Sequence, residues 1–562
     1  MNDELFQSAR QWANHDPDTA TSTRLLASLE AAEKGDEAAL AEVKAAMSGP
    51  LEFGTAGLRG EIGPGESRMN LAVVIRATAG LAAYLKTQTD RAPRVVVGCD
   101  ARYGSVDFAR AAARVLSAAG CHALALPVKN PTPLTSFAVR ALDADAGIMV
   151  TASHNPAKDN GYKVYLGGTV VSDAGQGAQI VPPHDARIAE AIAACPPADE
   201  VPQDTLNIED VDPRDDYVAA ATALARGSAE EKAALKITLT AMHGVGGALT
   251  KRVLTEAGFT QVDLVAQQAE PDPDFPTVSF PNPEEPGALD LAMEEAQRNA
   301  SDLIIAVDPD ADRCALAIPD PNAEKGWRQL SGDEIGSLLG EYIAQSAPAG
   351  SVFANSIVSS RLLERIASEH GLGYQHTLTG FKWIARTPGI RFGYEEAIGF
   401  CPDPDQARDK DGISTSVVAS SLFAGLKAKG SSGQEELDRM ARAYGCYLTM
   451  PLTFRVDNLG LITEGMDRLR SNPPKELAGS PVTEVTDLSK GWDGLPGTNA
   501  IMVLTEANDR VIARPSGTEP KLKCYCEVVV PVAVEDPVEV ARRTAADRLD
   551  AIKADLRGVL GL

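Results

Sequence analysis

The sequence has little of what a redox, zinc-thiolate or membrane protein needs. Its eight cysteines are scattered and none belongs to a C-x-x-C pair, which excludes zinc ribbons and thioredoxin chemistry. No run approaches the roughly 20 consecutive apolar residues of a transmembrane helix. The first residues lack the basic start and apolar stretch of a secretory leader. We therefore expect a cytoplasmic protein without a membrane partner.

Basic residues are also scarce. The chain has 53 Lys and Arg against 78 Asp and Glu, a formal net charge of −25. Nucleic-acid binding needs a basic face, and attraction to an anionic membrane needs a basic patch. Neither partner is expected. An anionic ligand would have to be held by a few cationic side chains gathered locally, because the net charge repels it.

The chain has room for about three to four domains at 562 residues. An Ala- and Glu-rich stretch with helical spacing opens it, and apolar strands then alternate with helices, which is typical of α/β layers. Toward the end, several strands precede one long amphipathic helix, which favours an α+β domain. We predict a linker at 196–213 and no regular element in the Pro-rich segment 271–286. The predicted domains are a helical extension over 1–50, α/β domains over 51–205, 206–325 and 326–442, and an α+β domain over 443–562.

A serine directly follows the apolar strand GIMV in the motif TASHNP at 151–156. Ser153 would be exposed there, in a turn fixed by Asn155 and Pro156. A lone serine of this kind is also typical of a helix N-cap. The flanking glycines of G-x-S-x-G are absent, so an acyl-transfer triad is not favoured.

Three carboxylates follow another buried strand in DPDADR at 308–313. Asp308, Asp310 and Asp312 would crowd like charges unless a cation lies between them, and carboxylate oxygens suit Mg²⁺ or Mn²⁺. An EF-hand is excluded, because Arg313 and Pro319 stand where it needs Gly and Glu.

Three further loops carry side chains that could bind hydroxyl groups or a phosphate. The pair Glu395 and Glu396 in GYEEAIG could accept hydrogen bonds from vicinal hydroxyls. The loop RPSGTEPK at 514–521 combines Arg, hydroxyls and Gly in the manner of a phosphate cradle, without the Walker spacing. Arg59 lies among the glycines of FGTAGLRG, where a guanidinium could neutralise a phosphate.

In this order, FGTAGLRG, TASHNP, DPDADR, YEEAIG and RPSGTEPK resemble the loops of the α-D-phosphohexomutase family of phosphoglucomutases and phosphomannomutases. The stretches KDNGYKVY, MHGVGG and TGFKW are similar to its phosphoglucomutase and phosphopentomutase branch. The resemblance covers about 51–530. It implies four domains around a central cleft: three similar mixed α/β sandwich domains and a C-terminal α+β domain, with the helical N-terminal extension added.

The resemblance implies a mutase that interconverts the 1-phosphate and 6-phosphate of a hexose, glucose first, through a phosphoserine and a sugar bisphosphate. A phosphopentomutase acting on ribose or deoxyribose, or a phosphomannomutase, is an alternative. A further, remote alternative is a non-catalytic protein that binds sugar phosphates. It is disfavoured because the serine and all three aspartates are present. One Mg²⁺ per active site, a sugar bisphosphate as activator, and a monomer or homodimer are expected.

The site residues follow from the same resemblance. The catalytic set is Ser153, Arg59, Lys163, Lys382 and His154. The substrate-binding set is Glu395, Glu396, Arg313, Arg514, Ser516, Gly517, Thr518 and Lys521. The metal ligands are Ser153, Asp308, Asp310 and Asp312. Lys163 or Lys382, with a pKa lowered by neighbouring cations, would transfer the proton, and His154 would first support the loop.

Overall fold

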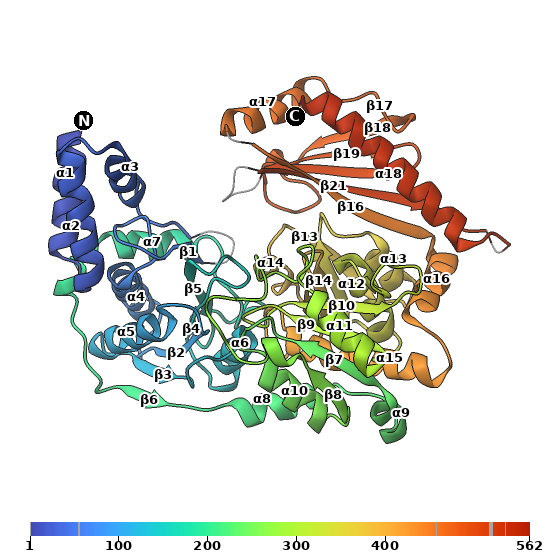
Figure 1. Ribbon diagram of the computed structural model, residues 1–562, viewed down its shortest axis with the longest axis horizontal. Helices are drawn as coiled ribbons and strands as arrows, with labels where there is room; N and C mark the ends of the chain where they lie inside the picture. Colours follow the sequence, from blue (N-terminus) through green and yellow to red (C-terminus); the bar gives the residue numbers. More distant parts are fainter. Residues whose placement is uncertain (1, 54–56, 457, 516–520, 534, 562) are drawn as a thin grey trace. The chain divides into compact units, whose positions relative to one another are not determined.

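The computed structural model describes residues 2–53, 57–456, 458–515, 521–533 and 535–561 (Figure 1). The chain forms two compact units. Unit 1 comprises Met1–Leu330, Ala385–Pro388 and Gly399–Gly425, and unit 2 comprises Ser331–Ile384, Gly389–Ile398 and Leu426–Leu562. Among the described residues, no helix has the length and apolar character needed to cross a bilayer.

Unit 1 begins with three helices, drawn in dark blue in Figure 1: α1 (Asn2–Asn14), α2 (Thr19–Glu33) and α3 (Glu37–Ala46). Two aspartates set their starts. Asp18 accepts a hydrogen bond from a backbone N–H at the start of α2, and Asp36 accepts two at the start of α3, which satisfies donors that a helix leaves open. Leu29 and Val43 are buried between the helices. The predicted helical extension is confirmed.

The first α/β layer has the strand order β1-β5-β4-β2-β3-β6. Its strands are β1 (Leu58–Glu61), β2 (Arg94–Cys99), β3 (His122–Ala125), β4 (Ala146–Val150), β5 (Asp159–Leu166) and β6 (Ile208–Asp210). Its helices are α4 (Leu71–Lys86), α5 (Ser105–Ala118), α6 (Thr132–Ala141) and α7 (His184–Ala193). Strands β4, β2, β3 and β6 are parallel, β5 pairs antiparallel with β4, and β1 pairs antiparallel with β5.

The segment 196–213, predicted as a linker, contains two short ordered elements. This segment holds the short 3₁₀ turn η1 (Ala198–Glu200) and the strand β6, which pairs with β3. An edge strand of three residues gains its order from backbone pairing, so acidic side chains need not alternate with apolar ones.

The second α/β layer has the order β11-β10-β9-β7-β8, with β8, β7 and β9 parallel and β10 and β11 antiparallel. Its strands are β7 (Lys236–Thr240), β8 (Gln261–Leu264), β9 (Leu303–Val307), β10 (Cys314–Pro319) and β11 (Trp327–Gln329). Its helices are α8 (Arg214–Thr222), α9 (Ala229–Ala234), α10 (Gly247–Glu256) and α11 (Asp290–Asn299), with the 3₁₀ turn η2 (Ala266–Gln268). The Pro-rich segment 271–286 contains no helix or strand, as predicted. The strand β15 (Gly399–Cys401) and most of α15 (Gly412–Ala428) also belong to unit 1.

Unit 2 contains a third sheet, with three parallel strands, and a fourth, antiparallel sheet. The first has β12 (Val352–Ser356) between β13 (Gly373–Thr377) and β14 (Ile390–Glu395). Its helices are α12 (Gly332–Ala344), α13 (Leu362–Glu369), α14 (Phe381–Ile384) and α16 (Gly433–Tyr444).

The antiparallel sheet has the order β16-β21-β20-β19-β18-β17. Its strands are β16 (Cys446–Arg455), β17 (Glu476–Leu477), β18 (Ser480–Asp487), β19 (Ile501–Thr505), β20 (Arg510–Pro515) and β21 (Lys521–Val530). The helices α17 (Leu459–Ser471) and α18 (Val538–Leu560) share one apolar core with it, and η3 (Leu488–Lys490) follows β18. The predicted α+β character of this end of the chain is confirmed.

Gly80 controls how closely α4 packs on α7. A Cβ added there would lie 2.4 Å from Cγ1 and 2.6 Å from the backbone nitrogen of Ile192. We expect Gly80→Ala to lower the free energy of unfolding by about 1–3 kcal/mol, because an overpacked contact forces the helices apart. Gly558→Ala is the matched control, since nothing lies within 4 Å of its Cβ position in α18, and it should stabilise by about 0.5–1 kcal/mol. Urea unfolding measures both, and equal effects would contradict the packing argument.

Candidate active site

The turn between β4 and β5 holds Ser153 in a strained conformation. Its φ is 52°, in the left-handed region that few non-glycine residues adopt. Its backbone N–H donates to Oγ1 of Thr151 at 2.9 Å, and its Oγ donates to Oδ2 of Asp308 at 2.8 Å. The prediction of an exposed serine is wrong: Ser153 is 3% exposed, because the aspartate loop packs directly against it. The turn therefore delivers the hydroxyl to the acidic cluster.

Arg102, which the motifs did not indicate, holds this turn through hydrogen bonds to its backbone. Its guanidinium lies 3.5 Å from the carboxylate of Asp100 and 5.1 Å from the ring centre of Phe275. Its two terminal nitrogens donate to four backbone carbonyls of the turn, those of Ser153 (2.7 Å), Asn155 (2.5 Å), Pro156 (2.8 Å) and Asp159 (3.1 Å). The sequence signal that could have indicated Arg102 is its position just after β2, the strand that pairs with β4.

The aspartates of DPDADR converge as predicted. The loop joins β9 to β10, and Asp308, Asp310 and Asp312 are buried, with candidate ligand atoms all within 4.8 Å of one another. Nζ of Lys163, from β5, lies 2.8 Å from Oδ2 of both Asp310 and Asp312. The other oxygen, Oδ1, of these two aspartates is buried and has no hydrogen-bond partner in the described chain. Buried carboxylate oxygens without donors are what a hard divalent cation would satisfy, so the residues fit a metal ion.

The pKa of Lys163 is shifted in the direction opposite to the prediction. Burial alone would lower its pKa, but the fields of Asp310 and Asp312 outweigh burial and raise the pKa above that of a free lysine. The same contact keeps the pKa of Asp312 below its usual range despite burial. Lys163 lies among carboxylates rather than cations, so it is an ammonium that neutralises the acidic loop. A lowered-pKa base at this position is not what the geometry provides.

Arg59 and His154 also lie beside the serine turn. Arg59, on β1, donates from Nη1 to Oδ1 of Asn155 at 3.0 Å. Nδ1 of His154 lies 3.1 Å from Oγ of Ser153, and burial, followed by the charges of Arg313 and Arg59, lowers its pKa well below the usual histidine value. His154 is thus a neutral imidazole that can orient the serine hydroxyl.

Lys410 was also missed by the motifs. Its Nζ lies 3.3 Å from Oδ2 of Asp312, so a segment about 100 residues downstream supplies a second ammonium to the aspartate loop. Arg313, whose Nε lies 3.9 Å from Oδ1 of Asp312, adds a guanidinium. The cluster therefore balances three buried carboxylates with nearby cations.

The predicted sugar-binding pair lies in unit 2. Glu395 ends β14 and is 8% exposed. Oε2 of Glu396 accepts hydrogen bonds from the hydroxyls of Ser356 (3.1 Å) and Ser359 (3.0 Å). Burial, and then the charge of Glu396, raises the pKa of Tyr525, whereas Arg514 acts in the opposite direction.

The remaining predicted residues also belong to unit 2. Lys382 lies in α14, and Lys521 begins β21 opposite Arg455 of β16. The predicted phosphate-binding residues Ser516, Gly517 and Thr518 lie outside the described residues.

The site and fold define a metal-compatible serine centre on α/β layers, and comparison with known proteins gives its class. Four family models match in chain order: phosphoglucomutase/phosphomannomutase α/β/α domain I (50–196), domain II (215–322), domain III (331–444) and the C-terminal domain (474–545). The chain belongs to the phosphoglucomutase/phosphomannomutase family, a family of phosphosugar mutases.

Relatives with different names match most of the chain. A probable phosphomannomutase of Haemophilus influenzae is 43% identical over 82% of this chain and 93% of its own. The phosphopentomutase of Homo sapiens is 33% identical over 96% and 94%, and a phosphoglucomutase of Staphylococcus haemolyticus 35% over 85% and 90%. The solved open form of the phosphoglucomutase parafusin from Paramecium superposes with a TM-score of 0.71 at 18% identity, over 91% of this chain and 96% of that one, which supports the fold.

The clamp by Arg102 gives a testable expectation. Arg102→Met removes the donors to four carbonyls and leaves Asp100 buried without its cation, so we expect a loss of about 3–5 kcal/mol in unfolding free energy. The exposed Arg110 of α5 provides the control Arg110→Met, which should change stability by less than about 0.5 kcal/mol. Denaturant unfolding of both variants decides the matter. Equal stability of the two would show that Arg102 does not hold the turn.

Proposed function

We propose that this protein transfers a phosphoryl group reversibly between the 1-position and the 6-position of a hexose, with glucose as the first candidate. Ser153, as phosphoserine, gives its phosphoryl group to the free hydroxyl of the sugar monophosphate, and the resulting bisphosphate returns its other phosphoryl group to Ser153. Such a covalent relay splits one transfer into two steps. The observation that carries the proposal is the Oγ of Ser153 lying 2.8 Å from Oδ2 of Asp308, within the buried aspartate cluster.

Mg²⁺ is the proposed metal, held by Asp308, Asp310, Asp312 and an oxygen of phosphorylated Ser153. The buried Oδ1 atoms of Asp310 and Asp312, which accept no hydrogen bond within the described residues, support it. When bound, the ion would offset the negative charge on the transferring phosphoryl group. A sugar bisphosphate is the proposed activator, because it can phosphorylate a free Ser153.

The chain's own residues do the rest in this proposal. Arg59 and Arg313 attract the phosphoryl oxygens, and the neutral ring of His154 orients Oγ of Ser153. Asp310 and Asp312 raise the pKa of Lys163, which favours its role as a positive charge beside the aspartate loop. We therefore assign proton transfer with the sugar hydroxyl to Lys382.

Recognition of the sugar is assigned to the loops of unit 2. Glu395 and Glu396 accept hydrogen bonds from sugar hydroxyls, and Arg514, with Ser516, Gly517, Thr518 and Lys521, holds the phosphate that is not reacting. The hydrogen bonds from two serines to Glu396 support this role, since they fix its carboxylate in place. Ribose and mannose phosphates are the alternatives, because relatives carry the names phosphopentomutase and phosphomannomutase.

The phosphoserine is tested by mass. Wild-type protein incubated with glucose 1,6-bisphosphate should gain one phosphoryl group on an intact-protein spectrum, and Ser153→Ala should gain none and lose turnover by several orders of magnitude. Ser346→Ala, at an exposed position, should behave as wild type. A Ser153→Ala variant that still becomes phosphorylated and turns over would refute the relay.

The metal is tested by binding and activity together. We expect EDTA to abolish mutase activity and added Mg²⁺ to restore it, because the phosphoryl charge is otherwise uncompensated. Calorimetry should show Mg²⁺ binding weakened at least about tenfold in Asp310→Asn, but unchanged in Asp320→Asn, a half-buried residue in the loop after β10. Full activity in excess EDTA, or equal Mg²⁺ affinity in both variants, would remove the metal from the proposal.

The sugar is tested by comparing kcat/KM for glucose 1-phosphate, mannose 1-phosphate and ribose 1-phosphate in coupled assays. We expect glucose 1-phosphate to be preferred, and Glu395→Gln to lower kcat/KM for the preferred sugar at least about tenfold through loss of a charge-assisted hydrogen bond. A preference for ribose or mannose would correct the substrate. No turnover of any of the three would favour a non-catalytic binding protein.

A further inference from the structure

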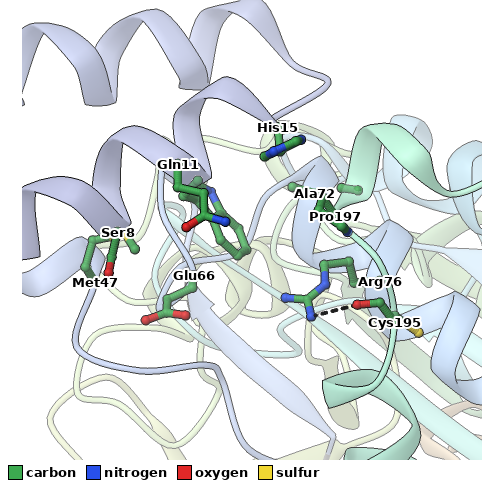
Figure 2. Close-up of a pocket in the computed structure, with 11 residues that line it drawn as sticks. Ser8, Gln11, His15, Met47, Glu66, Ala72, Arg76, Cys195 and Pro197 are labelled. Carbon is green, nitrogen blue, oxygen red and sulfur yellow. Dashed lines mark hydrogen bonds between the residues drawn. The ribbon is translucent and has the colours of Figure 1, made fainter. Parts of the chain in front are cut away.

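A cavity of about 300 Å³ lies where the helical extension meets the first α/β layer, away from the serine centre. Its walls come from α1, α4, the start of the segment after α7 and the turn before α4. Its lining includes Ser8, Gln11, Trp12, Glu66, Arg76 and Ala198. This volume is at the lower end of small-molecule sites in proteins. Figure 2 shows Gln11 and Glu66 on one side of the space and Arg76 on the other.

Arg76 gives the cavity a cation with spare donors. Nη2 lies 3.4 Å from the carbonyl oxygens of both Ile192 and Cys195, which is long for a hydrogen bond. Its Nε is buried and has no partner within the described residues. A guanidinium has five N–H donors arranged to hold a carboxylate or phosphate with two parallel bonds. The wall at Arg76 therefore suits an anionic group.

Trp12 adds a flat apolar surface and another donor. Its ring packs among Ala72 and Ala198 and joins the helical extension to the layer below. Its indole Nε1 is buried and, in the part of the chain that the structure describes, has no hydrogen-bond partner. Buried donors normally have partners, and each one left open is costly. A ligand with an apolar face and an acceptor oxygen would satisfy both features of this residue.

The opposite wall supplies acceptors. The carboxylate of Glu66 and the hydroxyl of Ser8 line the cavity, with the amide of Gln11 beside them. A carboxylate accepts hydrogen bonds and repels a second anion. The ligand must then carry one negative group, directed at Arg76, and hydroxyl donors at its other end.

We propose that this cavity is a second ligand site, which binds a polyhydroxylated ring or chain bearing one anionic group. A sugar acid and a sugar phosphate share this chemistry. The site is independent of the proposed phosphoryl relay, because no lining residue belongs to the serine turn or the aspartate loop. A bound ligand would connect the helical extension to α4 and stabilise their contact.

The experiment uses the full chain and two probes, gluconate and glucose 6-phosphate, by calorimetry and tryptophan fluorescence. Wild type should bind gluconate at one site, and glucose 6-phosphate at that site in addition to the catalytic one. Arg76→Ala should weaken gluconate binding at least tenfold. Arg24→Ala removes an equal charge from an exposed position on α2 and should leave it unchanged. Arg76→Ala should keep the mutase turnover of the wild type, which separates this site from the proposed reaction.

Two further variants keep the outcome decisive. Gln11→Trp should fill the cavity from its exposed side and block gluconate without removing Arg76, so a folding defect in Arg76→Ala cannot mimic the result. Trp12→Phe should remove the fluorescence change. Binding of glucose 6-phosphate alone would identify the phosphate as the recognised anion. Absence of binding by both probes beyond the catalytic site, or binding unaffected by Arg76→Ala and Gln11→Trp, would overturn the proposal.

Discussion

The contact of Lys163 with Asp310 and Asp312 is the constraint on which the serine centre depends. The ammonium comes from β5 of the first α/β layer, and the carboxylates come from the loop after β9 of the second, with both distances at 2.8 Å. Three buried carboxylates beside a serine would repel one another without it. Removing one partner of a buried ion pair costs about 3–5 kcal/mol, because the other charge is left uncompensated. The same contact thus joins the two α/β layers and reduces the repulsion among the carboxylates of the acidic loop.

The chemistry recurs at one position of a repeated layer. Ser153 follows β4, Asp308 follows β9, and Glu396 follows β14, each of which is a parallel strand of its sheet. In sheets of this kind, ligands bind beyond the carboxyl ends of the strands. Each of these turns carries different polar residues: a serine after β4, three aspartates after β9, and a pair of glutamates at the end of β14. This relation explains why the predicted site residues lie in loops that are far apart in the sequence.

Much of the fold could be predicted because apolar strands and amphipathic helices are local patterns. Arg94–Cys99 and Ile501–Thr505 are strands, as their apolar β-branched runs favour. The aspartates converge because their alternate spacing after a strand directs them to one point. β6 was missed because its order comes from pairing with β3, not from its side chains. Arg102 and Lys410 were missed because their partners are distant in sequence and they belong to none of the motifs.

The sequence by itself determined the net charge, the order of the motifs and the family, because composition and short motifs are carried by neighbouring residues. The tertiary structure alone decided which side chains are buried and in which direction their pKa values shift. It buried Ser153 under Asp308, raised the pKa of Lys163 instead of lowering it, and made His154 neutral. These properties depend on charges and solvent a few ångströms away through space. Residues that the chain separates by some 150 positions supply them, so no local pattern could reveal them.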